Sequence, residues 1–153
     1  MEVVLQEETT GCGLASVATL VKRRYAEVKA LANSLGIFAQ DSRLYSDTRY
    51  VRRLLGVYGV RVSEKETPFA SWPALPDRAL LAIKYQIENG RPFWHWVVFV
   101  REGGAPAVLD PAKDLSSNRR TDFDAMQPKW FIEVYPPSSS SAGIAPRGEA
   151  PPL

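Results

Sequence analysis

The chain has 153 residues, enough for one domain with a hydrophobic core and too few to expect two. With 45% hydrophobic and 24% charged residues, its composition is typical of a soluble globular protein. Nineteen basic and seventeen acidic residues give a net charge of +2, and short basic clusters such as Arg119–Arg120 are interpreted as solvated faces, which argues against a nucleic-acid-binding surface.

The cellular compartment is constrained by the cysteine count and the N-terminus. A single cysteine, Cys12, rules out an internal disulfide and suits a reducing compartment. The first residues carry acid where a signal peptide would carry base, and the longest apolar run, residues 93–100, is too short to cross a membrane. We therefore expect a soluble, cytoplasmic protein without a membrane span.

The first part of the chain has helical periodicity. Apolar residues recur three and four positions apart in three segments, residues 12–21, about 26–35 and about 48–58. Thr9 and Thr10 are candidate caps for the first helix, which places Cys12 in its first turn. Residues 37–47 have no clean period and are predicted to form a loop.

After Gly59 the pattern becomes extended. Strands are predicted at residues 60–62, 79–85, 93–101, 107–110 and 129–135. Turn signals at Glu88-Asn89-Gly90 and at Gly103-Gly104 separate the middle three, and a loop punctuated by three prolines precedes them. The expected fold class is α+β, with N-terminal helices packed on a C-terminal antiparallel sheet.

The chain divides into residues 1–135, which form the predicted domain, and a tail of residues 136–153. The tail is rich in proline, serine and glycine and poor in large apolar residues. Such a segment buries too little surface to offset the entropy of ordering it. We expect it to be disordered, with a linker as the alternative.

Cys12 is the first candidate for chemistry. At a helix start, N–H groups without intrahelical partners and the positive end of the helix dipole favour a thiolate, the nucleophilic form of cysteine. Gly11 and Gly13, which lack a Cβ, would leave the sulfur reachable for a peptide backbone. The alternative is that Cys12 is a small buried hydrophobic residue.

The chain has one histidine, His95, so any Cys/His catalytic pair must be Cys12 with His95. The alternative is an ordinary core or edge histidine in an apolar strand. If Gly103-Gly104 is a two-residue turn, the strand after it places Asp110 opposite Val97, on the same face as His95. A carboxylate in that position would hydrogen-bond the imidazole and stabilise its protonated form. Asp114 is a weaker candidate, and the alternative role of Asp110 is to start a turn before Pro111.

A cysteine nucleophile also requires donors for the oxyanion that develops on the attacked carbonyl. Gln6 precedes Cys12 by six residues and could supply its side-chain amide. The backbone N–H of Cys12 is free at the helix start. Without these neighbours, Gln6 would be read as an ordinary solvated glutamine.

Three segments together resemble a known family: QEETTGCGLASVATL at residues 6–20, HWVVFV at 95–100 and VLDPA at 108–112. They are similar to the double-glycine leader peptidases, best known as the N-terminal peptidase domain of bacteriocin-exporting ABC transporters, whose fold is papain-like. The resemblance covers about residues 1–135. It implies that Cys12 is the nucleophile, His95 the general base and acid, Asp110 the orienting carboxylate and Gln6 the oxyanion donor.

The resemblance implies cleavage after a Gly-Gly leader, with a peptide or protein as substrate. The chain has no phosphate-binding loop and no membrane helix, so we expect the domain to stand alone or to work with a separate ABC transporter. Two alternatives remain open: a non-catalytic peptide-binding module of the same fold, and a transpeptidase or amidase with the same triad. One cysteine and one histidine supply no usual metal-ligand cluster, so no metal or other cofactor is expected.

Overall fold

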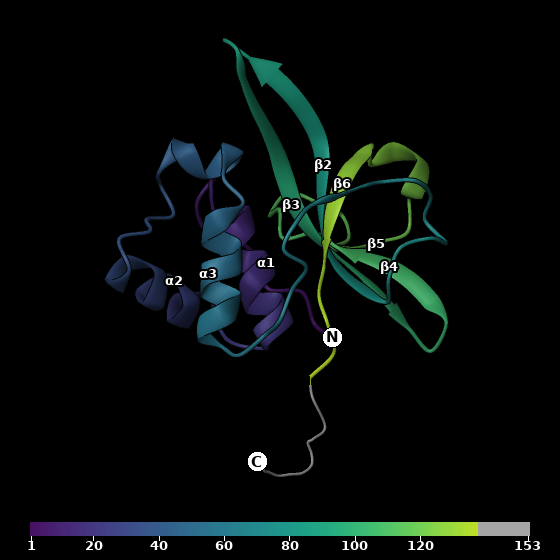
Figure 1. The fold of residues 1–153 in the computed structure, drawn as a ribbon, viewed down its shortest axis with the longest axis horizontal. Coiled ribbons are helices and arrows are strands. Elements are labelled where there is room, and N and C mark those ends of the chain that lie inside the picture. Colours follow the sequence, from purple (N-terminus) through teal and green to yellow (C-terminus); the bar gives the residue numbers. More distant parts are fainter. Residues whose placement is uncertain (138–153) are drawn as a thin grey trace.

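A computed structural model describes residues 1–137 of the chain, so the predicted tail lies outside the described residues from residue 138 onward. The described part begins with α1 (Cys12–Val21), α2 (Tyr25–Ser34), the 3-10 helix η1 (Ser42–Ser46) and α3 (Arg49–Val57). Figure 1 shows these helices gathered on one side of the molecule and the strands on the other. The predicted α+β class is confirmed, although the predicted loop at residues 37–47 contains η1.

Residues 67–133 supply a six-stranded sheet in the order β1-β6-β2-β3-β4-β5, and each neighbouring pair is antiparallel. The strands are β1 (Thr67–Pro68), β2 (Arg78–Glu88), β3 (Arg91–Glu102), β4 (Ala105–Leu109), β5 (Arg119–Arg120) and β6 (Pro128–Glu133), with the 3-10 helix η2 (Phe123–Ala125) before β6. The strand predicted at residues 60–62 is reduced to an isolated bridge between Val62 and Val134.

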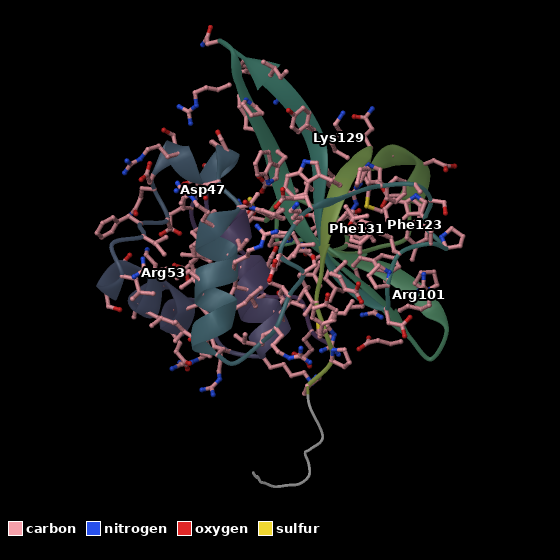
Figure 2. All side chains as sticks on the ribbon, viewed as in Figure 1. Asp47, Arg53, Arg101, Phe123, Lys129 and Phe131 are labelled. Atoms are coloured by element: carbon pink, nitrogen blue, oxygen red, sulfur yellow. The ribbon has the colours of Figure 1, made fainter. Side chains whose placement is uncertain are left out.

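Both faces of the sheet are buried. Alternate side chains of β3, among them Trp96 and Val98, pack against the helices, while Phe99 belongs to a second cluster on the opposite face. Phe131 and Phe123, labelled in Figure 2, lie in or against that second cluster, on the side of the sheet away from the helices. The strands therefore carry apolar residues on both faces, which is why their hydrophobic runs are continuous in sequence.

The helix α1 is the central helix of the domain. Nine of its ten residues are buried, and it packs against β3, α2 and α3. The apolar spacing in the sequence predicted one buried face, whereas small residues such as Ala15 and Ser16 allow neighbours to approach the other faces as well. No helix within residues 1–137 has the length and apolar character needed to cross a bilayer.

β2 and β3 extend beyond the rest of the sheet as a two-stranded arm (Figure 1). Pairing of β2 with β6 ends at Ile83, and pairing of β3 with β4 ends at Val98. The tip is a tight turn in which Asn89 and Gly90 have positive φ angles of 52° and 77°. A bulge at residues 84–85 interrupts the arm near its base. His95 lies at this base.

Candidate active site

Cys12 is the first residue of α1, as the sequence predicts, but the cap is different from the predicted one. The N-cap residue is Gly11, and no side chain of the described part of the chain caps the helix. The hydroxyl of Thr10 donates instead to the carbonyl of Ala39, so it ties the helix start to the segment before η1. The Cys12 N–H therefore begins a helix whose first-turn donors have no intrahelical acceptor.

The two glycines beside Cys12 serve packing rather than access, which corrects the sequence interpretation. A Cβ at Gly11 would overlap the hydroxyl of Tyr25, and a Cβ at Gly13 would overlap the ring of Tyr50. Both tyrosines are buried against the helix start. As a result Cys12 is only 3% exposed, so any substrate must reach a sulfur that lies below the surface.

The sulfur of Cys12 lies at the edge of β3. Its Sγ accepts the backbone N–H of Trp96 at 3.4 Å. The last paired residues of β3 and β4 are Val98 and Leu109, so Trp96 lies just beyond the point where β4 ends. The sulfur thus takes the position that a carbonyl of a neighbouring strand would occupy. This contact brings Cys12 to the strand that carries His95, the residue preceding Trp96.

The β3–β4 hairpin has the predicted register, from the pair Glu102–Ala105 to the pair Val98–Leu109. Asp110 follows β4 directly, and its Oδ1 lies 2.7 Å from Nε2 of His95. The predicted hydrogen bond between these side chains is therefore present. Asp110 is 1% exposed, and its Oδ1 also accepts the N–H of Ala112 at 3.0 Å.

The electrostatics of this pair favour charges on both partners. Burial by itself lowers the pKa of His95, but the hydrogen bond to Asp110 and the interaction with Cys12 outweigh it and raise this pKa to about 9. Burial raises the pKa of Asp110, but the hydrogen bond to His95, helped by Ala112 and Arg120, lowers it to about 2. At neutral pH the site therefore holds an imidazolium bonded to a carboxylate. With Nε2 engaged by Asp110, Nδ1 is the nitrogen left to exchange a proton with Cys12.

Gln6 is buried next to the helix start, yet its amide is occupied. Its Nε2 donates to the carbonyls of Glu8 and Thr9, both at 3.0 Å, and its Oε1 is buried without a partner among the described residues. The backbone N–H of Gln6 donates to the carbonyl of Pro111 at 3.0 Å. Gln6 thus joins the segment before Cys12 to the loop after Asp110. Its role as oxyanion donor stays a prediction, because the side-chain amide would first have to give up one of its two hydrogen bonds.

Arg120 belongs to the site but was interpreted from sequence as part of a solvated cluster. Its Nη1 donates to Oδ2 of Asp110 at 2.9 Å, and its side chain is only 11% exposed. The neighbouring Arg119 is 48% exposed. Successive side chains of a strand point to opposite faces, so Arg119 and Arg120 point in opposite directions. A strand of two residues is too short to show this alternation as a sequence pattern.

A cleft of about 580 Å³ opens beside His95, between the arm and η1. Tyr45 of η1 and Phe93 of β3 line it, with ring centroids 5.8 Å apart. Trp94 of β3 is 7% exposed and also contributes to the wall. Lys84, Glu88 and Arg91 of the arm add two basic side chains and one acidic side chain to the lining.

The structure brings Asp110 to the side chain of His95, Cys12 to the strand that carries His95, and Gln6 to the loop after Asp110, and His95 is the one of these four residues that lines the cleft. Among the described residues no hydrogen bond joins Asp114 to His95. Within residues 1–137 no group of three or more His, Cys, Asp or Glu side chains could hold a metal ion. No model of a known protein family matches this sequence, and no curated protein matches it either.

Proposed function

We propose that this protein is a cysteine endopeptidase with a papain-like fold, which cuts a peptide bond through an acyl-enzyme on Cys12. The observation that carries the proposal is that the only cysteine lies against the strand of the only histidine and contributes to the raised pKa of that histidine, while Nε2 of the histidine is hydrogen-bonded to a buried carboxylate. A sulfur that served only packing would need neither the base nor the carboxylate behind it.

The reaction follows from the positions of these groups. Protonated His95 stabilises the Cys12 thiolate, which attacks the substrate carbonyl carbon, and the N–H of Cys12 faces the developing oxyanion. His95 then gives its proton to the leaving amine as the C–N bond breaks, which leaves a thioester on Cys12. Water, deprotonated by His95, attacks the thioester and releases the acid and the thiol. Asp110 keeps the ring oriented throughout.

The burial of Cys12 supports a restricted substrate. Because the sulfur is 3% exposed, the residue that supplies the attacked carbonyl must bring its backbone close to the helix start. Glycine permits the closest backbone approach. We therefore propose cleavage after a Gly-Gly leader, as the sequence resemblance implies, with the adjoining part of the peptide in the cleft beside His95. A separate ABC transporter is the proposed partner that would receive the product.

A second candidate function is a non-catalytic peptide-binding module. The observation in its favour is the occupied amide of Gln6, which offers no free donor to an oxyanion. The cleft and the buried sulfur would then serve only to hold a peptide. A transpeptidase or amidase would share the acyl-enzyme and differ only in the acceptor that attacks the thioester.

Peptide cleavage tests the proposal directly. Peptides that contain a Gly-Gly site are incubated with the wild type and with Cys12→Ala, and the products are identified by mass spectrometry. Cleavage after Gly-Gly by the wild type alone is expected. Cleavage at another bond by the wild type alone would support the peptidase and reject the Gly-Gly substrate, and equal results for both proteins would reject leader processing.

Alkylation of Cys12 by iodoacetamide separates an enzyme from a binder without a substrate. At pH 7 the substitution His95→Ala is expected to slow alkylation at least about tenfold, because the thiolate loses its imidazolium. The same substitution also opens space beside the sulfur. If burial alone governed reactivity, alkylation would therefore become faster, and that result would favour the peptide-binding module.

A further inference from the structure

Arg120 connects the buried carboxylate of the site to the surface. Its Nη1 donates to Asp110 Oδ2 at 2.9 Å, while its Nε and Nη2 donate to the two carboxylate oxygens of Asp122 at 2.9 and 2.7 Å. The guanidinium therefore makes three hydrogen bonds to two carboxylates. Because the planar guanidinium is hydrogen-bonded to Asp110 on one side and to Asp122 on the other, it has little freedom to rotate.

These bonds determine which oxygen of Asp110 is available to the imidazole. Oδ2 is engaged by Arg120, and Oδ1 accepts from His95 and from the N–H of Ala112. The backbone of Asp110 is held as well, because its N–H donates to the carbonyl of Asn118 and its carbonyl accepts the side-chain amide of Asn118. Every polar atom of Asp110 thus has a partner, and within residues 1–137 Arg120 is the only side chain that binds Oδ2.

We propose that Arg120 is a positioning residue of the active site, which fixes the Asp110 carboxylate so that Oδ1 faces His95 Nε2, and that Asp122 anchors Arg120 from the surface. This inference rests on the proposed function for its kinetic consequence, but its geometric content does not. Arg120 touches neither the substrate nor the reacting atoms. It acts through Asp110 alone.

Two physical roles of Arg120 predict opposite effects on His95. If Arg120 only contributed a positive charge, its removal would relieve repulsion of the imidazolium and raise the pKa of His95. If Arg120 positions Asp110, its removal frees the carboxylate to rotate and weakens the bond to Nε2, so the pKa of His95 falls from about 9 towards its ordinary value. The sign of the change therefore distinguishes positioning from charge.

The experiment is an NMR titration of the imidazole in the full chain, where His95 is the only histidine and gives unambiguous signals. Arg120→Met keeps the length and apolar stem of the side chain and removes its donors. A fall of the pKa of His95 by about one unit or more is expected, with kcat on a cleaved peptide reduced about tenfold or more and little change in KM.

Arg119→Met is the matched control, because Arg119 is the adjacent residue of β5 and pairs with Glu102 on the exposed side. It should leave both the pKa of His95 and kcat unchanged. Asp122→Asn covers the case in which Arg120→Met fails to fold. It removes only the exposed anchor, whose side chain is 54% exposed, and should shift both quantities in the same direction by less.

The titration also separates this inference from the proposed function. A rise or no change in the pKa of His95 in folded Arg120→Met, or an equal effect of Arg119→Met, would overturn the positioning role. If Arg120→Met does not fold, an unchanged pKa in Asp122→Asn would overturn it. If no peptide is cleaved by the wild type, the proposed peptidase fails, yet a fall of the pKa in the variant still establishes that Arg120 positions Asp110.

Discussion

The His95–Asp110 pair makes a specific prediction about stability at alkaline pH. Folding raises the pKa of His95 from 6.5 to about 9. A group with a raised folded-state pKa contributes stability that is fully present below its unfolded pKa and is lost as pH rises through its folded pKa. The rise of about 2.5 pKa units corresponds to about 3 kcal/mol at 1.36 kcal/mol per unit. The side chain of His95 is 19% exposed, so solvent screening of this interaction is limited.

The assay is urea unfolding of the wild type and of His95→Gln at intervals between pH 6 and pH 9.5. His95→Gln retains a polar side chain of similar reach and has no titration in this range. The free energy of unfolding of the wild type is expected to fall by about 3 kcal/mol more than that of the variant over this interval. Parallel curves for the two proteins would refute the charged imidazolium at this site, and with it the electrostatic part of the mechanism.

Further substitutions test the carboxylate and the packing at the helix start. Asp110→Asn should lower kcat about 10²-fold or more, because the imidazolium loses its partner, whereas the exposed Asp114→Asn should retain activity in the same peptide assay. Because folding lowers the pKa of Asp110 to about 2, the wild type should lose stability as pH falls from about 4 to about 2, and acid unfolding of Asp110→Asn should lack this loss. Gly13→Ala should destabilise the fold by about 1–3 kcal/mol in thermal unfolding, since the added Cβ overlaps Tyr50. The same substitution at Gly56, inside α3 and with open space around it, should stabilise the fold by up to about 1 kcal/mol, so equal effects at the two glycines would contradict the packing described at Cys12.

The contact between His95 and Asp110 could be predicted from sequence because local rules determine it. A two-residue turn at Gly103-Gly104 sets the pairing of every residue in the hairpin, and strand alternation then decides which side chains share a face. The start of α1 at Cys12 follows from the same kind of local pattern. These features involve neighbours in the chain or in one hairpin, so they do not require knowledge of the tertiary packing.

The surroundings of the site could not be predicted in this way, because they depend on partners distant in sequence. Gly11 and Gly13 lie against Tyr25 and Tyr50, and nothing in the residues around Cys12 indicates this. Arg120 meets Asp110 only because a two-residue strand pairs with β4. In both cases the sequence identifies the residue, but only the tertiary fold determines which other residues it contacts and therefore what role it has.

The hydrogen bond from Trp96 to the Cys12 sulfur spans 84 positions of the chain. A contact of such long range carries the entropy of closing a large loop, so it is slower to form than contacts within one helix or hairpin. During synthesis the ribosome releases the first helix well before the strand that carries the imidazole. The sulfur therefore reaches the strand that carries the imidazole only once β3 has packed on the helix, so under the proposed function the site would be assembled only in the folded chain.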